Sequence, residues 1–436
     1  MEDREKIYSI LFDCMEKGAF SNLSLSGEGV DDFVRAAVYG TLTHVYSEDY
    51  LIKTVSGKDV GTMDPAVRTI LRFGTWQIVF SSKVPDYAAV NSSVDLAKRH
   101  AARAQGLVNA VLRKIAALDE SERDLSSNKN PDAAFSLKPE IYGLIKKSYG
   151  KDRAPSIARA LLEPSPLAIR VNTLKTDAGM LRNELELENF TVSESSFMDD
   201  ALIIKPTGDS PSIEKSLAFR SGDFMVQGEA AQLASLIAEP KKGMRILDCC
   251  AAPGGKSTHM AALTCNEASI TALDINKSRV ELINENAGRL GVASIEAKVA
   301  DSTGFSDDEG FDLVLCDAPC SGLGIMGGKP DIRLTITYER IEEIKVKQKQ
   351  ILNNVGRLVK PGGTLVYSTC TINRGENEEQ VESFLAENKD FEANSFDNIL
   401  PERLKSRPNN GMLTLLPDED GCEGFFIARL RRKNGC

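Results

Sequence analysis

The stretch ILDCCAAPGGKST, residues 246–258, joins a short apolar run to a turn of small residues. Three further apolar, β-rich runs follow it: ITALDI at 270–275, DLVLCD at 312–317 and GTLVYST at 363–369. Helical patterns separate these runs, such as KSRVELINENAGRL at 277–290 and EEIKVKQKQILNNVGRLV at 342–359. Alternating strands and helices are typical of a parallel sheet with helices on both faces, so an α/β domain is predicted from about residue 223.

The turn after the first strand, residues 250–256, has the composition of a nucleotide-binding turn. Small residues let the backbone approach a ligand, and the following helix N-terminus offers free N–H groups. The turn is not GxGxxG, and it is not a P-loop, because the position that needs the first glycine holds Cys250. A plain tight turn is the simpler interpretation, but a Pro-Gly-Gly-Lys run directly after a buried strand favours a ligand site.

Carboxylates follow the next two strands. Asp274 ends the second strand, where an acidic residue can bind both ribose hydroxyls of a nucleoside cofactor. The same residue could instead cap the helix that begins in NKSRVEL, and the two roles can coexist. Asp301, at the end of AKVAD, is placed to reach an adenine amino group.

Two thiols are expected at the same edge of the sheet, where ligands bind in such folds. The fourth strand ends in Asp317-Ala-Pro-Cys320, and Cys370 directly follows GTLVYST. A cysteine is usually a small buried hydrophobe, and we expect this role for Cys249, Cys265 and Cys316, which lie in apolar runs. Cys320 and Cys370 lie in turns beyond strand ends, where nucleophiles are displayed.

The front of the chain, to about residue 118, shows apolar residues three and four apart and is predicted to be all-helical, with Trp76 in its core. One helix pair carries basic residues that could form either a solvated face or an RNA-backbone patch: Lys98, Arg99, His100, Arg103, Arg113 and Lys114. Residues 119–136 are polar and are interpreted as a linker. A basic segment at 137–159 precedes a small α+β unit, in which PLAIRVNTL and TVSESSFMDDALIIKP suggest strands around the helix GMLRNELELEN.

Composition excludes several classes of protein. The chain has 436 residues, a net charge of −10 and nine cysteines, an odd number that argues against a disulfide framework. The cysteines form no CxxC pair and the three histidines are scattered, so no metal site is expected. No apolar run is long enough to span a membrane, and the acidic start MEDREKIYSI is unlike a signal peptide. We therefore expect a cytoplasmic protein with no membrane association.

Three motifs together carry a family resemblance. PCSG after an aspartate, STC after a strand and CAAPGGK after the first strand resemble the Sun-type (NOL1/NOP2/Sun) RNA cytosine-C5 methyltransferases, over residues from about 160 to the end. At the front, VPDYAAVNSSVDLAKRH (84–100) and GLVNAVLRKI (106–115) resemble the RNA-binding domain of the antitermination factor NusB. A NusB-like front on a Sun-type catalytic part is the layout of a bacterial 16S ribosomal RNA methyltransferase family.

The resemblance implies three domains: an all-α NusB-like domain with its linker at 1–136, a basic connector with a small α+β, RRM-like domain at 137–222, and a Rossmann-like methyltransferase domain at 223–436. It implies S-adenosylmethionine as cofactor and 16S ribosomal RNA as partner. We expect the chain to act as a monomer. The implied cofactor residues are Cys250, Ala251, Ala252, Pro253, Gly254, Gly255, Lys256, Asp274, Asp301 and Asp317.

The resemblance also assigns the chemistry. It makes Cys370 the nucleophile, Cys320 the group that assists proton removal and product release, and Asp317 the partner of the cytosine edge. Chemistry alone leaves the choice between the two cysteines open, because DNA cytosine-C5 enzymes use the cysteine of their Pro-Cys motif. The residues implied to contact RNA are Arg170, Asn172, Lys329 and Arg333.

The chain departs from the family pattern at two places. Gly327 and Gly328 precede the Pro-Asp pair where basic or bulky residues are usual, and the last motif reads GCEGFF where DGFF is common. The first departure bears on contacts with the target site. Three alternatives stay open on sequence grounds: a tRNA substrate, a non-catalytic NusB-like RNA-binding factor, and an NAD-dependent dehydrogenase, which the missing GxGxxG disfavours.

Overall fold

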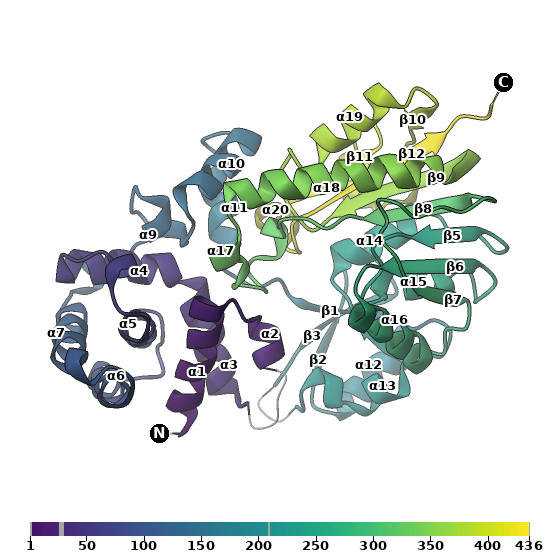
Figure 1. The fold of residues 1–436 in the computed structure, drawn as a ribbon. Coiled ribbons are helices and arrows are strands. Elements are labelled where there is room, and N and C mark those ends of the chain that lie inside the picture. The colour runs from purple at the N-terminus through teal and green to yellow at the C-terminus, as the bar shows by residue number, and fades with distance from the viewer. Residues whose placement is uncertain (1, 26–29, 208–209, 436) are drawn as a thin grey trace. The chain divides into compact units, whose positions relative to one another are not determined.

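The computed structural model describes residues 2–25, 30–207 and 210–435 (Figure 1). The chain divides into two compact units, one formed by residues 1–164 and 325–338 and the other by residues 165–324 and 339–436. The predicted fold class is confirmed, with a helical front, a small α+β middle and an α/β sheet near the C-terminus. The predicted domain boundaries at residues 136 and 222 stay predictions, and the two compact units divide at residue 164.

The first unit is helical. Its longer helices are α1 (Glu2–Lys17), α3 (Asp32–Thr43), α4 (Val45–Ser56), α5 (Pro65–Val79), α6 (Asp86–His100), α7 (Gln105–Ala116) and α10 (Pro139–Tyr149). Its shorter ones are α2 (Ser21–Ser24), α8 (Glu120–Arg123), α9 (Pro131–Phe135), α11 (Ala154–Ala160) and α17 (Ile332–Thr335). Trp76 lies in the core, as predicted. A Cβ on Gly40 of α3 would lie 2.1 Å from Trp76 Nε1, so this close helix crossing requires glycine.

The segment interpreted as a linker, residues 119–136, is instead a packed part of this unit. It forms α8 and α9, and Leu125 and Ala133 are buried against Leu51 of α4. Ser47 of α4 donates a hydrogen bond of 2.8 Å to the carbonyl oxygen of Ala133. The linker prediction was wrong because a few apolar side chains in a polar segment are enough to dock short helices.

The basic face predicted on α6 and α7 is partly paired within the unit. Arg99 lies 3.2 Å from the Glu5 carboxylate of α1, and the His100 ring stacks on Tyr8 with centroids 4.1 Å apart. Lys114 donates to the carbonyl oxygen of Val55. These three contacts are structural, and they leave the choice between a solvated face and an RNA patch open for the other residues.

The second unit begins with a small antiparallel sheet. Its strands are β1 (Leu167–Val171), β2 (Thr191–Glu194), β3 (Ala201–Lys205) and β4 (Phe224–Val226), in the order β2-β3-β1-β4. Helices α12 (Ala178–Leu187) and α13 (Leu217–Ser221) accompany it. The predicted order of strand, helix and strands is confirmed, and β4 is an additional strand that the pattern did not indicate.

The larger sheet of this unit has the strand order β10-β12-β9-β8-β5-β6-β7, with β11 paired to β12. The strands are β5 (Arg245–Asp248), β6 (Ser269–Asp274), β7 (Ile295–Val299), β8 (Phe311–Asp317), β9 (Val359–Thr369), β10 (Phe391–Ala393), β11 (Met412–Leu415) and β12 (Phe425–Arg432). Strands β5 to β9 are parallel, as predicted, whereas β10, β11 and β12 add an antiparallel edge.

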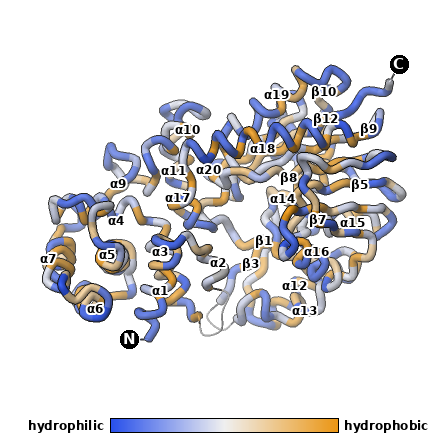
Figure 2. The backbone as a smooth tube through the Cα atoms, viewed as in Figure 1, coloured by the Kyte–Doolittle hydropathy of each residue, from blue (hydrophilic) through white to orange (hydrophobic). Residues whose placement is uncertain are grey.

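Helices cover both faces of this sheet. They are α14 (Glu229–Ile237), α15 (Gly255–Leu263), α16 (Lys277–Leu290), α18 (Tyr338–Arg357), α19 (Glu378–Glu387) and α20 (Pro417–Asp420). Alternate residues of β8 face opposite layers: Leu313 and Leu315 pack with α14 and α15, while Val314 and Cys316 pack with α18 and α19. Along α18 the tube in Figure 2 changes between blue and orange, as expected of a helix with one buried face.

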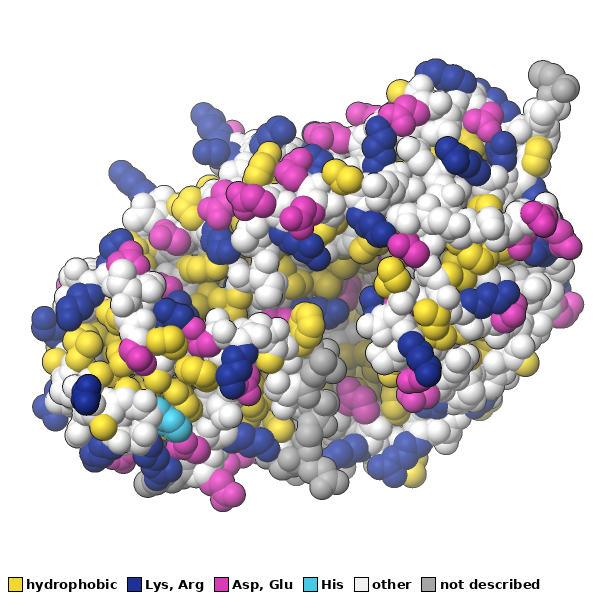
Figure 3. All heavy atoms as spheres, viewed as in Figure 1, with side chains coloured by type: hydrophobic (Ala, Val, Ile, Leu, Met, Phe, Trp, Pro, Cys, Tyr) yellow, Lys and Arg dark blue, Asp and Glu magenta, His cyan; other side chains and the backbone are white. Residues whose placement is uncertain are grey.

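The net charge of −10 does not produce a uniformly acidic surface. Lys and Arg side chains are interspersed with Asp and Glu over the face shown in Figure 3. Among the described residues, no helix is long and apolar enough to cross a membrane.

Glu48 of α4 generates a stability prediction for the first unit. It is fully buried, both carboxylate oxygens lack a hydrogen-bond partner, and burial raises its pKa well above the ordinary value. The folded chain therefore keeps the proton that the unfolded chain loses above about pH 4.5. Stability contributed by this proton is complete below that pH and is lost as the pH rises toward the folded-state pKa.

We expect Glu48→Gln to stabilise the first unit at pH 8, with a gain that shrinks toward pH 4. Unfolding can be followed by the fluorescence of Trp76, the single tryptophan, which reports on this unit. The exposed Glu140 provides the matched control, Glu140→Gln. Equal pH dependence of the wild type and Glu48→Gln would contradict the assignment.

Candidate active site

The turn between β5 and α15 is built for close approach of a ligand. Gly254 has φ +97°, a left-handed conformation that favours glycine, and it precedes α15 without any side-chain cap. The first N–H groups of this nine-residue helix are therefore not taken by a capping side chain. Behind the turn, Asp248 is buried and accepts a hydrogen bond from Ser257, and burial raises its pKa to about 6.

The two further carboxylates lie where the strands predicted them. Asp274 ends β6, is almost fully buried, and accepts a hydrogen bond of 3.0 Å from the backbone N–H of Asn276. Asn276, not Asp274, caps α16, so the capping alternative for Asp274 is wrong. Asp301 follows β7, and hydrogen bonds from Thr303 and the nearby Lys347 lower its pKa.

Asp317 connects the cofactor turn to the strand that carries Cys370. Its Oδ2 lies 2.7 Å from Lys256 Nζ, and its Oδ1 accepts a hydrogen bond of 2.8 Å from Ser368. Lys256 is mostly buried: burial lowers the pKa of its ammonium, but Asp317 more than offsets this and the pKa is raised. Both carboxylate oxygens of Asp317 thus have partners within the site.

Cys320 and Cys370 are brought together, as the strand ends indicate. Their Sγ atoms lie 3.3 Å apart, and both residues are half-buried. The contact with Cys370 and burial raise the pKa of Cys320 well above the ordinary value. Either thiol can be the hydrogen-bond donor in this contact, so one proton can be shared between the two sulfur atoms.

The other thiols divide differently from the prediction. Cys249 and Cys316 are buried, as expected, whereas Cys265 is exposed at a positive φ of 54° just after α15. The prediction of a buried Cys265 was wrong because the helix ends before it and the apolar run continues into a turn. Cys436 lies outside the described residues.

Three of the four residues expected to contact RNA are buried in protein. Arg170 donates to Gln227 Oε1, to the carbonyl oxygen of Gly255 and to Thr258 Oγ1. Asn172 donates to the carbonyl oxygens of Gly222 and Leu290. We therefore replace RNA contact with a structural role for Arg170 and Asn172, which join the small sheet to the cofactor turn and to α16.

Arg333 is corrected in the same way. It is fully buried in the first unit, where it donates to the carbonyl oxygens of Phe135, Ser136 and Leu161. The Gly327 departure has a packing cause in the same unit, because a Cβ there would lie 1.9 Å from the carbonyl oxygen of Glu163. Lys329 is exposed and remains the RNA-contact candidate of the set.

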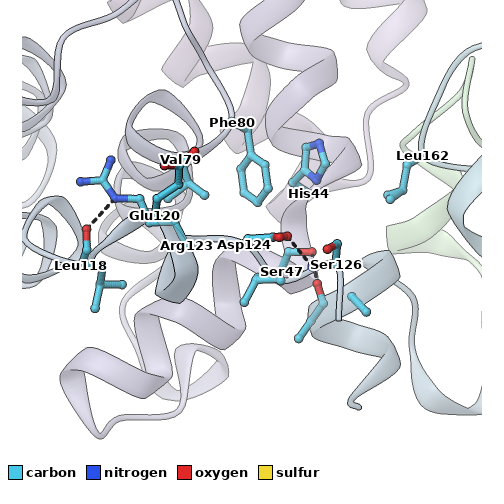
Figure 4. A pocket seen from close by; sticks show the side chains of 13 residues that line it. His44, Ser47, Val79, Phe80, Leu118, Glu120, Arg123, Asp124, Ser126 and Leu162 are labelled. Atoms are coloured by element: carbon cyan, nitrogen blue, oxygen red, sulfur yellow. Dashed lines mark hydrogen bonds between the residues drawn. The ribbon is translucent and has the colours of Figure 1, made fainter. Parts of the chain in front are cut away.

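A cavity of about 710 Å³ lies within the first unit (Figure 4). Its walls include Val79, Phe80 and Leu118, and the ring of His44 stacks on Phe80 with centroids 3.9 Å apart. Burial and Arg333 lower the pKa of His44 to about 4. The cavity holds none of the predicted site residues.

Within the described ranges, no cluster of three or more His, Cys, Asp or Glu could hold a metal.

Family models match all three parts of the chain. The 16S rRNA methyltransferase RsmB/F model matches residues 235–431, the NusB family model residues 1–117, and the ferredoxin-like domain of RsmF/B-like methyltransferases residues 141–209.

Whole-length relatives agree with the family models. The chain is 36% identical to the probable ribosomal RNA small subunit methyltransferase B of Bacillus subtilis, over 91% of this chain and 89% of the relative. It is 29% identical to ribosomal RNA small subunit methyltransferase B of Vibrio cholerae, over 91% and 88%. Among solved structures, that of PH0851 has a TM-score of 0.80 at 25% identity over 98% of each chain. NSun6 from Pyrococcus horikoshii has a TM-score of 0.62 at 25% identity over 69% of this chain and 100% of that one.

Fold and comparisons together define an RNA methyltransferase that uses S-adenosylmethionine. More particularly, the chain belongs to the RsmB/F family of 16S rRNA methyltransferases. The cofactor suits the residues present: the uncapped N-terminus of α15 follows a turn with no bulky side chain, and Asp274 ends the next strand.

Sequence reasoning missed several residues around the two thiols. Ser368 bonds Asp317, and Gln348, Glu376 and Asn377 are buried behind Cys320 and Cys370. The signal for the last two was weak, because GENEEQ reads as the polar start of an acidic helix. Nothing in the local pattern indicates that its first two polar side chains point inward.

The buried position of Arg170 yields a test that separates the two roles considered for it. Arg170→Met removes donors to the carbonyl oxygen of Gly255 and to Thr258, at the start of α15. We expect binding of S-adenosylmethionine, measured by calorimetry, to weaken about tenfold, the effect of about one lost hydrogen bond. The exposed Lys215→Met serves as control.

The salt dependence of RNA binding discriminates further. A residue that contacts a phosphate lowers the slope of log K against log salt by about 1 when it is removed. We expect an unchanged slope for Arg170→Met. A reduced slope together with an unchanged affinity for the cofactor would show that Arg170 contacts RNA after all.

Proposed function

We propose that this chain methylates C5 of a cytosine in 16S ribosomal RNA through a covalent bond between Cys370 and cytosine C6. The observation that carries the proposal is the pair of thiols with Sγ atoms 3.3 Å apart, next to Asp317 and the cofactor turn. One of two nearby thiols can act as the nucleophile and the other as a proton-transfer group, and this reaction needs both roles.

The chemistry explains the need for a thiol. Cytosine C5 is an aromatic carbon with no lone pair and attacks a methyl group poorly. When the Cys370 thiolate adds to C6, the C5–C6 double bond is lost and the ring becomes an enamine whose C5 is nucleophilic. The cofactor supplies an electrophilic methyl group. After transfer, loss of the C5 proton expels the Cys370 thiolate and restores the aromatic ring.

The remaining residues fit complementary roles. Cys320, whose Sγ lies 3.3 Å from that of Cys370, would exchange a proton during adduct formation and release. Asp317 would hydrogen-bond the N3/N4 edge of the base, and Lys256 and Ser368 fix the orientation of its carboxylate. Asp274 and Asp301 would hold the ribose and the adenine of the cofactor. The base must leave its stack for C6 to be reached, at a cost that is lowest in a loop.

Two matches support ribosomal RNA as the substrate. The Bacillus subtilis relative is a probable ribosomal RNA small subunit methyltransferase, and the front of this chain matches the NusB family. Lys329 is exposed and is the residue of the predicted set that we propose for contact with a phosphate. A tRNA substrate is the alternative that an experiment must exclude.

The substrate can be identified by incubating the purified chain with radiolabelled S-adenosylmethionine and protein-free 16S RNA, tRNA or DNA. We expect label in 16S RNA, and nucleoside digestion should recover it as 5-methylcytidine. Label confined to tRNA would replace the substrate, and label at another atom would refute the C5 assignment. Absence of transfer to any RNA, where a known enzyme works, would refute the proposal.

The cysteine roles are tested by paired substitutions. We expect Cys370→Ala to abolish transfer, because the enamine cannot form without the thiolate. We expect Cys320→Ala to accumulate a covalent protein–RNA adduct that survives denaturing electrophoresis, because release is slowed. The exposed Cys265→Ala is the matched control and should behave as wild type. An active Cys370→Ala would show that the nucleophile assignment is wrong.

A further inference from the structure

We propose that Glu376 and Asn377 are the positioning residues that hold Cys320 and Cys370 in contact. Asn377 hydrogen-bonds the residues on both sides of Cys370. Glu376 and its neighbour Gln348 together do the same for Cys320. The proposal deepens the proposed function, because it concerns the same two thiols. Both residues lie between β9 and α19 and are fully buried.

Glu376 acts on the loop of Cys320. Its Oε2 accepts a hydrogen bond of 2.8 Å from the backbone N–H of Ser321, and its Oε1 accepts one of 2.6 Å from Ser321 Oγ. Gln348 of α18 donates from Nε2 to the carbonyl oxygen of Pro319 at 2.9 Å and to Glu376 Oε2 at 3.2 Å. The residues before and after Cys320 are thus fixed by one connected pair of side chains.

Asn377 acts on Cys370 in the same manner. Its Nδ2 donates a hydrogen bond of 2.9 Å to the carbonyl oxygen of Thr371, and its Oδ1 accepts one of 2.6 Å from Thr369 Oγ1. Thr369 and Thr371 are the immediate neighbours of Cys370. One amide side chain therefore spans the cysteine and fixes the backbone from which its thiol projects.

The two halves are also joined to each other. The hydroxyls of Ser321 and Thr371 lie 2.8 Å apart, and Asn373 donates to Glu376 Oε1 at 3.1 Å. Each cysteine is followed by a hydroxyl residue, and these two hydroxyls meet beside one carboxylate. The Sγ separation of 3.3 Å is consequently set by a buried network behind the thiols.

The identity of the two side chains matters because their partners are specific. The backbone N–H of Ser321 can only donate, so an amide NH₂ in place of Oε2 would meet another donor. At position 377, the carbonyl oxygen of Thr371 can only accept, so it requires the NH₂ that asparagine supplies. Burial is the main cause that raises the pKa of Glu376, and the hydrogen bonds from Ser321, Asn373 and Gln348 oppose it.

The test compares Glu376→Gln and Asn377→Asp with wild type in the full-length chain. Each is close to isosteric and disturbs the hydrogen bonds without creating a cavity. Glu379, three residues beyond Glu376 and exposed, provides the matched control Glu379→Gln. Circular dichroism and cofactor binding confirm that each variant is folded. Ser321→Ala, which removes only one hydroxyl, carries the test if Glu376→Gln does not fold.

The first readout is the geometry of the thiols. Diamide oxidises two adjacent thiols to a disulfide and takes up their two electrons and two protons as a hydrazine, and peptide mass spectrometry quantifies the Cys320–Cys370 product. We expect rapid disulfide formation in wild type and Glu379→Gln. We expect formation to be about tenfold slower in Glu376→Gln and Asn377→Asp, in line with the loss of about one hydrogen bond. Alkylation of the exposed Cys265 should stay unchanged in all.

The second readout is catalysis. We expect kcat for methyl transfer to fall about tenfold or more, because a displaced nucleophile lowers the rate more than it alters binding, with the KM for S-adenosylmethionine within about threefold of wild type. An unchanged rate of disulfide formation and an unchanged kcat in folded Glu376→Gln and Asn377→Asp would overturn the proposal. The disulfide assay needs no RNA. A wild type that fails to methylate would therefore contradict the proposed function, while the disulfide rates would still test the positioning role of Glu376 and Asn377.

Discussion

The carboxylate of Asp317 is the point on which the geometry of the site depends. It ends β8, which lies between β5 and β9 in the sheet, so its side chain can reach the helix that follows β5 and the end of β9. Lys256, just after the cofactor turn, lies 2.7 Å away, and Ser368, two residues before Cys370, lies 2.8 Å away. This ion pair is costly to break, because the ammonium of Lys256 is mostly buried and would be left without its partner. The turn and the thiol strand therefore keep a fixed relation before any ligand binds.

A close backbone contact at Gly324 also holds the loop of Cys320 against Cys370. Gly324 follows the Cys320 loop, donates to the carbonyl oxygen of Cys370 at 3.1 Å, and accepts from the N–H of Gly424 at 2.9 Å. A Cβ on Gly324 would lie 1.9 Å from the carbonyl oxygen of Gly424, so both positions require glycine. The PCSG region and the GCEGFF motif, about a hundred residues apart, are thus two sides of one contact. This explains why the glycine of the last motif is retained although the residue before it differs from the common pattern.

The sequence was sufficient wherever a structural rule is local or periodic. Parallel strands β5 to β9 follow from short apolar runs separated by helical patterns, and their carboxyl ends bring Asp317, Cys320 and Cys370 to one edge. The antiparallel strand β12 could not be predicted in its place, because its pairing with β9 joins segments about sixty residues apart and no local pattern encodes the partner. Glu376 was missed for a related reason: a charged residue at a helix start is normally solvated, and only the tertiary fold surrounds this one with donors.

The arginines show the limit of reasoning from residue type. A guanidinium has five donors in a rigid plane, which suits phosphate oxygens and backbone carbonyl oxygens equally well. Arg170 and Arg333 use these donors on the chain itself, and burial lowers the pKa of each to about 9. The same property that makes arginine a phosphate ligand makes it a cross-link between loops that have unpaired carbonyls. A loop rich in exposed carbonyl oxygens is a feature of the folded chain, so an arginine in an RNA-binding protein can be assigned to RNA only after its burial is known.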